Sequence, residues 1–288
     1  MWIIYALFSA FAAAGSRAFI KSAGKNATNM SIVFCRSAIG ALLAWILIAF
    51  TGLPLVKSGF YLAVIAGCAF DVTAILCMSR ALQSGSMAKS VPLLSFTPAF
   101  LLITGELILG ETATMQGIIG VLVIVVGSYF LHVQPDTKSI LQPIKLLFSR
   151  SSARLMLLCS LFFGFTGPFF KRAIQLSDPF FAMAASLTIS TLLMALLQLA
   201  RRNSVVDLLP THSNWRALIG VGIAVFFVAL SVNLALDTGL VSYVISLKRL
   251  GILVNIAIGA VFFGEKDLLH NLLAGGTMVA GAALITLS

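Results

Sequence analysis

The sequence is poor in charged residues, and acidic residues are the scarcest of them. Only 10% of its 288 residues are Asp, Glu, Lys or Arg, with 9 acidic against 19 basic, whereas 60% are hydrophobic. Soluble domains carry about 25% charged residues, so the composition excludes an ordinary soluble protein. The net charge of +10 is scattered over loops and segment ends, and nucleic-acid binding requires a clustered patch. We therefore predict an integral membrane protein that contacts the lipid bilayer and no nucleic acid.

Residues that build catalytic, metal and redox sites are few and far apart. The four cysteines lie inside apolar segments without metal-ligand or CxxC spacing, and the three histidines are distant from one another. The sequence has no paired-carboxylate metal motif, nucleophile elbow or phosphate-cradling glycine loop. We predict no metal, no cofactor, no disulfide and no enzymatic activity.

Long apolar runs dominate the chain. About 20 apolar residues in a helix cross a hydrocarbon core of roughly 30 Å. The first run ends like a signal peptide but lacks a basic n-region, so we interpret it as a spanning helix. We predict an all-α polytopic membrane protein with ten transmembrane helices, at 2–20, 30–50, 60–82, 87–109, 114–132, 154–174, 179–199, 215–236, 241–263 and 268–287.

The two halves of the chain repeat each other in register. Residues 81–85 (ALQSG) align with 235–239 (ALDTG), and 105–111 (GELILGE) align with 259–265 (GAVFFGE), at one offset, since 239 − 85 = 154 and 265 − 111 = 154. Five helices per copy is an odd number, so the second copy enters the membrane from the opposite side, as in inverted-repeat transporters. The predicted parts are a first five-helix repeat (1–135), a linker with a short surface helix (136–153) and a second five-helix repeat (154–288).

Small residues recur in the fifth and tenth segments. Gly120 and Gly127 correspond to Ala274 and Gly281, and each pair is seven residues apart and so on one helix face. Because small residues let transmembrane helices approach closely, we expect these two helices to pack against each other.

The ninth segment carries two adjacent cations near its middle. A charge at the bilayer centre costs roughly 2.5–3.5 kcal/mol on insertion scales, so the folded protein must give this pair water, partners or a ligand. As one helix, the segment places its polar side chains in two neighbouring stripes. The residues that we predict to bind substrate are Ser242, Ser246, Lys248, Arg249 and Asn255.

Two alternatives remain for Lys248 and Arg249. They bind an anionic group of the substrate directly, the guanidinium through its planar fork of donors, or an acid such as Asp71 or Glu106 neutralises them inside the protein. Desolvation favours the protonated form of a carboxyl group, so either acid is also a candidate proton carrier. Arg36 is the candidate structural partner of Asp71.

Prolines mark the equivalent position of the first half. Since 248 − 154 = 94 and 249 − 154 = 95, the cations correspond to Leu94 and Ser95, which lie between Pro92 and Pro98. Proline removes a backbone donor and frees a carbonyl, so we predict a helix break near the midplane. The break either only shapes the helix or turns loosened carbonyls toward a cavity.

Two five-helix halves, each with a Gly-Glu pair after its fourth helix (Gly110-Glu111 and Gly264-Glu265) and a glycine-bearing fifth helix, resemble the drug/metabolite transporter superfamily, in particular its EamA-like members. This resemblance covers essentially the whole chain. The run KRLGILVNIAIGAVFF from Lys248 is also similar to the ninth helix of the triose-phosphate translocator branch, where a Lys-Arg pair binds the substrate's phosphate; that similarity rests on one helix.

The resemblance implies a secondary transporter. We expect an exporter or exchanger of a small polar, anionic metabolite that works by alternating access, with protons as a candidate coupling ion and a monomer as a sufficient unit. The alternatives are a proton-coupled exporter of cationic or amphipathic drugs, with Asp71 or Glu106 as carrier, and a non-transporting membrane scaffold subunit.

The expected location is a bacterial inner membrane, and two arguments about orientation disagree. Most basic residues fall on one side, with only Lys57, Lys171 and Arg172 on the other, so the positive-inside rule places both termini outside the cytoplasm. The family resemblance implies that both termini are cytoplasmic.

Overall fold

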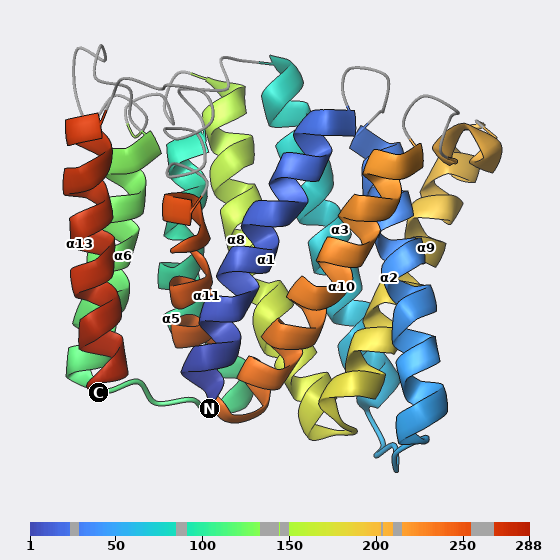
Figure 1. Cartoon of the computed structure of the whole chain (residues 1–288), viewed down its shortest axis with the longest axis horizontal. Helices are drawn as coiled ribbons and strands as arrows, with labels where there is room; N and C mark the ends of the chain where they lie inside the picture. Colours follow the sequence, from blue (N-terminus) through green and yellow to red (C-terminus); the bar gives the residue numbers. More distant parts are fainter. Residues whose placement is uncertain are drawn as a thin grey trace. The chain divides into compact units, whose positions relative to one another are not determined.

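The structure, a computed structural model, describes residues 1–23, 29–84, 91–132, 144, 150–202, 204–209, 215–254 and 268–288. Every regular element within these residues is a helix. In chain order the elements are α1 (Trp2–Ala23), α2 (Asn29–Thr51), α3 (Phe60–Ser84), η2 (Val91–Phe96), α5 (Thr97–Leu109), α6 (Met115–His132), α8 (Ser151–Gln175), α9 (Pro179–Ala200), η3 (Val205–Leu208), α10 (Trp215–Thr238), α11 (Val241–Lys248) and α13 (Leu268–Thr286) (Figure 1).

Six described stretches are long and apolar enough to cross a membrane. They are Met30–Thr51, Phe60–Met78, Pro92–Leu109, Ser151–Gln175, Pro179–Ala200 and Trp215–Thr238. Shorter apolar helices occur at Trp2–Ser16, Met115–Leu131 and Leu273–Thr286. The helices confirm the predicted class, an all-α protein with many membrane segments.

Two predicted segments differ from the observed helices. The segment predicted at 87–109 has a 3-10 helix, η2, before the α-helix α5. The segment predicted at 241–263 is not one helix, because α11 ends at Lys248. A turn at residues 249–250 follows, α-helical residues resume at Gly251, and Asn255 lies outside the described residues, so the predicted stripes stay a prediction.

The predicted linker, 136–153, is shorter than expected at its C-terminal end. Helix α8 begins at Ser151, so the last three positions of this linker are helical. Apart from Ile144 and Arg150, the remainder of the linker, including its expected surface helix, falls outside the described residues.

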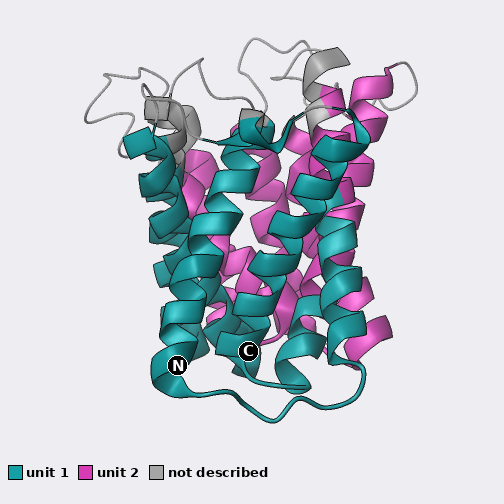
Figure 2. Ribbon diagram, turned by 90° about the vertical axis from the view of Figure 1, so that its right-hand side faces the viewer, with its two compact units in different colours: residues 1–72, 169–238 teal, residues 73–168, 239–288 magenta. Residues whose placement is uncertain are grey.

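The chain forms two compact units, which Figure 2 colours separately. Unit 1 consists of Met1–Val72 and Phe169–Thr238, and unit 2 of Thr73–Pro168 and Gly239–Ser288. Each unit takes residues from both halves of the sequence, and the boundaries fall inside α3 and α8. These two units do not correspond to the two repeats predicted from the sequence, 1–135 and 154–288, and the limits of the repeats stay a prediction.

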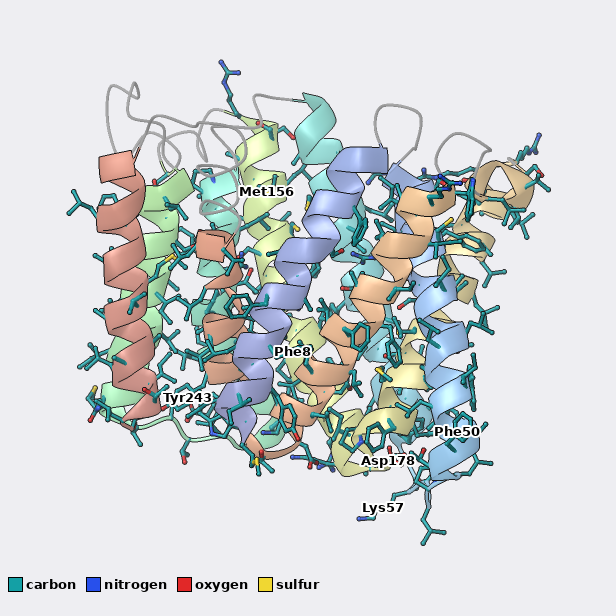
Figure 3. All side chains as sticks on the ribbon, in the orientation of Figure 1. Phe8, Phe50, Lys57, Met156, Asp178 and Tyr243 are labelled. Carbon is teal, nitrogen blue, oxygen red and sulfur yellow. The ribbon has the colours of Figure 1, made fainter. Side chains whose placement is uncertain are left out.

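Unit 1 is built from α1, α2, α9 and α10 with the adjoining parts of α3 and α8. Helix α1 packs along α10, and α2 contacts both α9 and α10. Helix α9 has a strong start: Oδ1 of Asp178, labelled in Figure 3, accepts hydrogen bonds from the N–H groups of Phe180 (2.6 Å) and Phe181 (2.8 Å). Pro179 occupies the first turn, where a missing N–H costs nothing.

In unit 2, α6 and α13 lie side by side (Figure 1). A Cβ added to Gly120 would lie 2.7 Å from the carbonyl oxygen of Gly281, and one added to Gly281 would lie 2.7 Å from that of Gly120. A Cβ on Gly127 would lie 3.0 Å from the carbonyl oxygen of Ala274. These contacts confirm the predicted close approach, because a larger residue at these glycines would separate the two backbones.

Candidate functional site

Both ends of α11 are held by residues from the first half of the chain, all within unit 2. The residue before this helix, Leu240, provides no side-chain cap. Instead, the N–H of Val241 donates a hydrogen bond of 2.9 Å to Oε2 of Glu111. A carboxylate at a helix N-terminus satisfies an orphan donor and complements the helix dipole. Glu111 therefore acts as a cap supplied from 130 residues away.

The Gly-Glu pair at the end of α5 explains how Glu111 reaches that position. Gly110 adopts φ 71° and ψ 24°, the left-handed conformation that glycine adopts without a Cβ clash. Its N–H bonds to the carbonyl of Glu106, which is the bond of an αL C-cap, and the N–H of Glu111 bonds to the carbonyl of Gly105. The glycine thus turns the chain so that the next residue projects toward α11.

Tyr243 fixes the first turn of α11 to the start of α6. Its side chain, labelled in Figure 3, is 5% exposed. The hydroxyl accepts a hydrogen bond from the N–H of Thr114 (3.1 Å) and lies 3.3 Å from the Thr114 hydroxyl oxygen. A Cβ on Gly117 would overlap the Tyr243 hydroxyl, so the ring fits only against a glycine.

The C-terminal end of α11 coincides with the two cations. Lys248 is the last helical residue, Arg249 is the C-cap, and both are half-buried. From there the backbone bonds span three residues: the N–H of Leu250 bonds to Leu247, that of Ile252 to Arg249, and that of Leu253 to Leu250, at 2.9–3.0 Å. Arg249 and Leu250 form a turn, and α-helical residues resume at Gly251, so the cations lie at a break in the helix.

Arg249 binds a carbonyl to which the following proline cannot donate. Pro98 has no N–H for an α-helical bond to the carbonyl of Leu94, and Leu94 lies in the 3-10 helix η2, where the N–H three residues later, that of Thr97, faces this carbonyl. Nη2 of Arg249 donates to this carbonyl oxygen at 2.9 Å, and the hydroxyl of Thr97 donates to it at 2.8 Å. This carbonyl of η2 is therefore bonded by a neutral hydroxyl and by a guanidinium.

A second proline in unit 2 produces the same situation without a charge. Pro168 lies inside α8, so the carbonyl of Gly164 loses its α-helical donor. The hydroxyl of Thr104, on α5, donates to that oxygen at 2.7 Å. A hydroxyl from a neighbouring helix takes the place of the missing N–H.

Buried hydroxyl pairs surround the junction of η2 and α5. The hydroxyl oxygens of Ser95 and Ser128 lie 2.8 Å apart, and those of Thr97 and Ser160 lie 3.1 Å apart. Both pairs are buried between helices, where hydrogen bonds between transmembrane segments contribute about 0.6 kcal/mol on average.

The two serines predicted to bind substrate are buried inside α11. Ser242 is 3% exposed and Ser246 is 0% exposed. The hydroxyl of Ser246 donates to the carbonyl of Ser242 at 2.6 Å, so this donor is used within its own helix.

The remaining predicted residues lie in different places. Asp71 on α3 and Arg36 on α2 are half-buried and belong to unit 1, whereas Glu106 on α5 is exposed and belongs to unit 2. Asp71, Lys248 and Arg249 each take part in at least one interaction of the folded chain, and the charge pairs suggested for them stay predictions.

Several residues escaped the sequence-based prediction. Pro168 stands visibly inside an apolar segment, so the freed carbonyl of Gly164 was predictable, although its partner Thr104 was not. Tyr243 gave no signal beyond its position. Lys171 is 6% exposed in α8, and because it is buried it reports membrane orientation less reliably than a loop lysine.

The described residues contain no group of three or more His, Cys, Asp or Glu side chains arranged to hold a metal ion. Helices of membrane-spanning length and composition define a multi-pass integral membrane protein.

A model of the EamA-like transporter family matches residues 1–133 and 150–287. The chain therefore belongs to the EamA-like transporter family, which is part of the drug/metabolite transporter superfamily. The members of this family are membrane transporters and not enzymes.

No curated protein sequence matches the chain. Among solved structures, one crystal structure is similar with a TM-score of 0.79 and 15% sequence identity, over 99% of this chain and 97% of that chain. At this identity the similarity shows a shared fold.

Proposed function

We propose that the protein is a secondary transporter that moves a small metabolite with a negative group by alternating access. In this proposal Arg249 and Lys248 bind the negative group. The observation that carries it is the position of Arg249, half-buried at the break after α11, with Nη2 2.9 Å from the carbonyl oxygen of Leu94.

The bond to Leu94 does not by itself account for a charged residue. Thr97 already donates to the same carbonyl, and Thr104 shows that a hydroxyl is sufficient for the freed carbonyl of Gly164. A guanidinium carries five N–H donors and is expensive to hold in a membrane. A guanidinium with this many donors can bind an anionic ligand in addition to the carbonyl of Leu94.

The helix break also suits a site that is occupied and emptied. The C-terminal end of a helix carries partial negative charge, which stabilises nearby cations by about 0.3–1 kcal/mol. Lys248 and Arg249 occupy this end of α11. The helix end thus stabilises both cations while the site is empty. This stabilisation is small, so it does not prevent an anionic ligand from binding them.

The test is exchange transport in proteoliposomes loaded with labelled carboxylates and sugar phosphates. Lys248→Gln and Arg249→Gln should each reduce transport at least 10-fold, because each removes a cation from the site. Lys57→Gln is the matched control, since Lys57 is exposed and lies between helices. Full transport by both site variants of every substrate that the wild type moves would refute the anion site.

Proton coupling is a second proposal, and burial favours Asp71 over Glu106 as the carrier. Asp71 is half-buried within α3, whereas Glu106 is exposed near the end of α5. Burial disfavours the ionised form of a carboxyl group, so a partly buried carboxyl group is the better candidate to gain and lose a proton during transport. We expect Asp71→Asn to abolish uptake driven by a pH gradient and to leave exchange at equal pH intact, and Glu106→Gln to retain both.

We also propose ten transmembrane helices arranged as two inverted repeats, 1–135 and 154–288, in a bacterial inner membrane. The family model matches the chain in two stretches of corresponding length. The contacts between α6 and α13 also agree with the repeat. Gly120 contacts Gly281 and Gly127 contacts Ala274, and adding the offset turns each pair into the other, since 120 + 154 = 274 and 127 + 154 = 281. An impermeant maleimide applied outside cells should label Ser288→Cys if the charge argument on orientation holds, and should not if the termini are cytoplasmic.

A further inference from the structure

Unit 1 carries an apolar groove between α1 and α10, which lie side by side in Figure 1. The groove has a volume of about 390 Å³. Small residues form its floor, Ala12 and Gly15 on α1 and Gly220 and Ala224 on α10. The space above Gly15 is open, since an added Cβ would meet no atom within 4 Å, whereas the ring of Phe19 lies over Gly220, where an added Cβ would be 2.7 Å from it.

Aromatic rings form the walls of this α1–α10 groove. They belong to Phe8, Phe11, Phe19 and Phe227, which are between 43% and 60% exposed. Figure 3 labels Phe8 beside the lower part of α1. All residues that line the groove are apolar, so its occupant is apolar along the whole length.

The length of the groove corresponds to one leaflet of a bilayer. Its α1 residues run from Phe8 to Phe19, which is about 16 Å at a rise of 1.5 Å per residue. The hydrocarbon core of a bilayer is roughly 30 Å thick. A chain that enters from one membrane surface and fills the groove would thus reach about the midplane.

One end of the groove is basic. Arg216 precedes Gly220 by four residues on α10 and so lies on the same helix face, one turn beyond the groove. Its guanidinium carbon lies 5.3 Å from the ring centroid of Trp215, and both side chains are exposed. Tryptophan and arginine at a helix end are the residues that anchor a helix at the membrane surface.

We propose that the α1–α10 groove binds an anionic phospholipid, with one acyl chain between the phenylalanines and the phosphate at Arg216. The apolar lining fits an acyl chain, and the length of the groove fits a chain that spans one leaflet. The guanidinium of Arg216 fits a negatively charged headgroup. The site is confined to unit 1 and is independent of the proposed transport site in unit 2.

Native mass spectrometry of the purified full chain tests this proposal. The probes are phosphatidylglycerol and phosphatidylcholine with identical acyl chains, mixed in equal amounts. The wild type should retain one phosphatidylglycerol in preference to phosphatidylcholine. Gly15→Leu should reduce retention of both lipids at least 5-fold, because a Cβ at Gly15 meets no atom within 4 Å and a leucine would fill the groove. Arg216→Gln should lower phosphatidylglycerol retention to the phosphatidylcholine level and leave phosphatidylcholine unchanged.

Two controls match these variants. Gly276→Leu introduces the same side chain on α13, where a Cβ also meets no atom within 4 Å, and Lys57→Gln removes an exposed cation elsewhere in unit 1. Both should retain lipid like the wild type. Unchanged lipid binding in folded Gly15→Leu, or an equal loss in Gly276→Leu, would overturn the proposal.

A change from dimer to monomer in Gly15→Leu with unchanged lipid retention would assign the groove to a second copy of the chain and would also overturn the proposal. Thermal melting followed by circular dichroism identifies a variant that fails to fold. Arg216→Gln, a surface change, then decides the question: loss of the headgroup preference supports the site and its persistence rejects it.

Discussion

Unit 2 satisfies two proline-freed carbonyls in different ways. The carbonyl of Gly164 accepts from one neutral hydroxyl, that of Thr104 at 2.7 Å. The carbonyl of Leu94 accepts from the hydroxyl of Thr97 at 2.8 Å and from the guanidinium of Arg249 at 2.9 Å. Both solutions provide a donor in place of a missing N–H, but only the second places a charge inside the membrane protein.

The comparison distinguishes a hydrogen bond that only stabilises the backbone, at Gly164, from one that also positions a charged side chain, at Leu94. The hydrogen bond from Nη2 of Arg249 to the carbonyl of Leu94 orients the guanidinium, and a guanidinium can bind an anion as well as a carbonyl oxygen. At Gly164 nothing beyond helix stability is at stake. Variants at the two carbonyls can therefore be compared directly, because a charged side chain donates to one carbonyl and only a neutral hydroxyl donates to the other.

The largest effect is expected for Arg249→Gln. Transport of an anion should fall at least 10-fold, and thermal unfolding should show a loss of roughly 1.5–3 kcal/mol, the value of a hydrogen bond to a charged group. Arg249→Lys should recover part of the transport, because it keeps the charge but loses the planar fork. Loss of stability with intact transport would show that Arg249, like Thr104, only stabilises the fold, and would contradict the proposed difference between the two carbonyls.

Thr104→Val should have the next largest effect on stability. It removes the hydroxyl that donates to Gly164, and hydrogen bonds of this kind between membrane helices contribute about 1–2 kcal/mol in model peptides. Transport per folded molecule should not change. Denaturation in mixed micelles measures the first quantity, and reconstituted exchange normalised to folded protein measures the second.

Pro98→Ala sharpens the comparison by restoring an N–H to the helix. This N–H would compete with Arg249 for the carbonyl of Leu94, so the stability cost of Arg249→Gln should be smaller in the Pro98→Ala background. A double-mutant cycle should give a coupling energy on the order of 1 kcal/mol. Additive effects would show that the bond of Arg249 to Leu94 contributes nothing.

Thr97→Val should have the smallest effect of the four. Arg249 continues to donate to Leu94 after the hydroxyl is removed, and the interhelical bond that is lost is the one between Thr97 and Ser160. The expected loss is therefore about 0.6 kcal/mol, the average for interhelical bonds in a membrane protein. A loss larger than that of Thr104→Val in the same unfolding assay would reverse the ranking of the two carbonyls.

The sequence predicted the features that depend on composition and on small residues. Apolar runs gave the membrane segments, and Gly120 and Gly281 gave the crossing of α6 and α13, because side-chain volume alone determines how closely two helices approach. Pro98 likewise indicated where a carbonyl would be free.

The sequence could not predict which groups meet. The end of α11 at Lys248 has no proline, and only Gly251 hints at a break, so the segment was expected to be one helix. The pairing of Glu111 with Val241 joins residues 130 positions apart, and no local pattern encodes it. The pairing of Arg36 with Asp71 stays a prediction, since charge type alone does not fix distance.

The cap that Glu111 provides to α11 also imposes an order on biosynthesis. Its partner, the N–H of Val241, lies 130 residues later in the chain, and ribosomes add about 5–20 residues per second, so it is made roughly 7–26 s afterwards. During this interval the carboxylate of Glu111 lacks the N–H of Val241 that donates to it in the folded protein. Docking of α11 is therefore a late step, and a nascent chain that stops before Val241 has its Gly-Glu turn in place with no helix to receive.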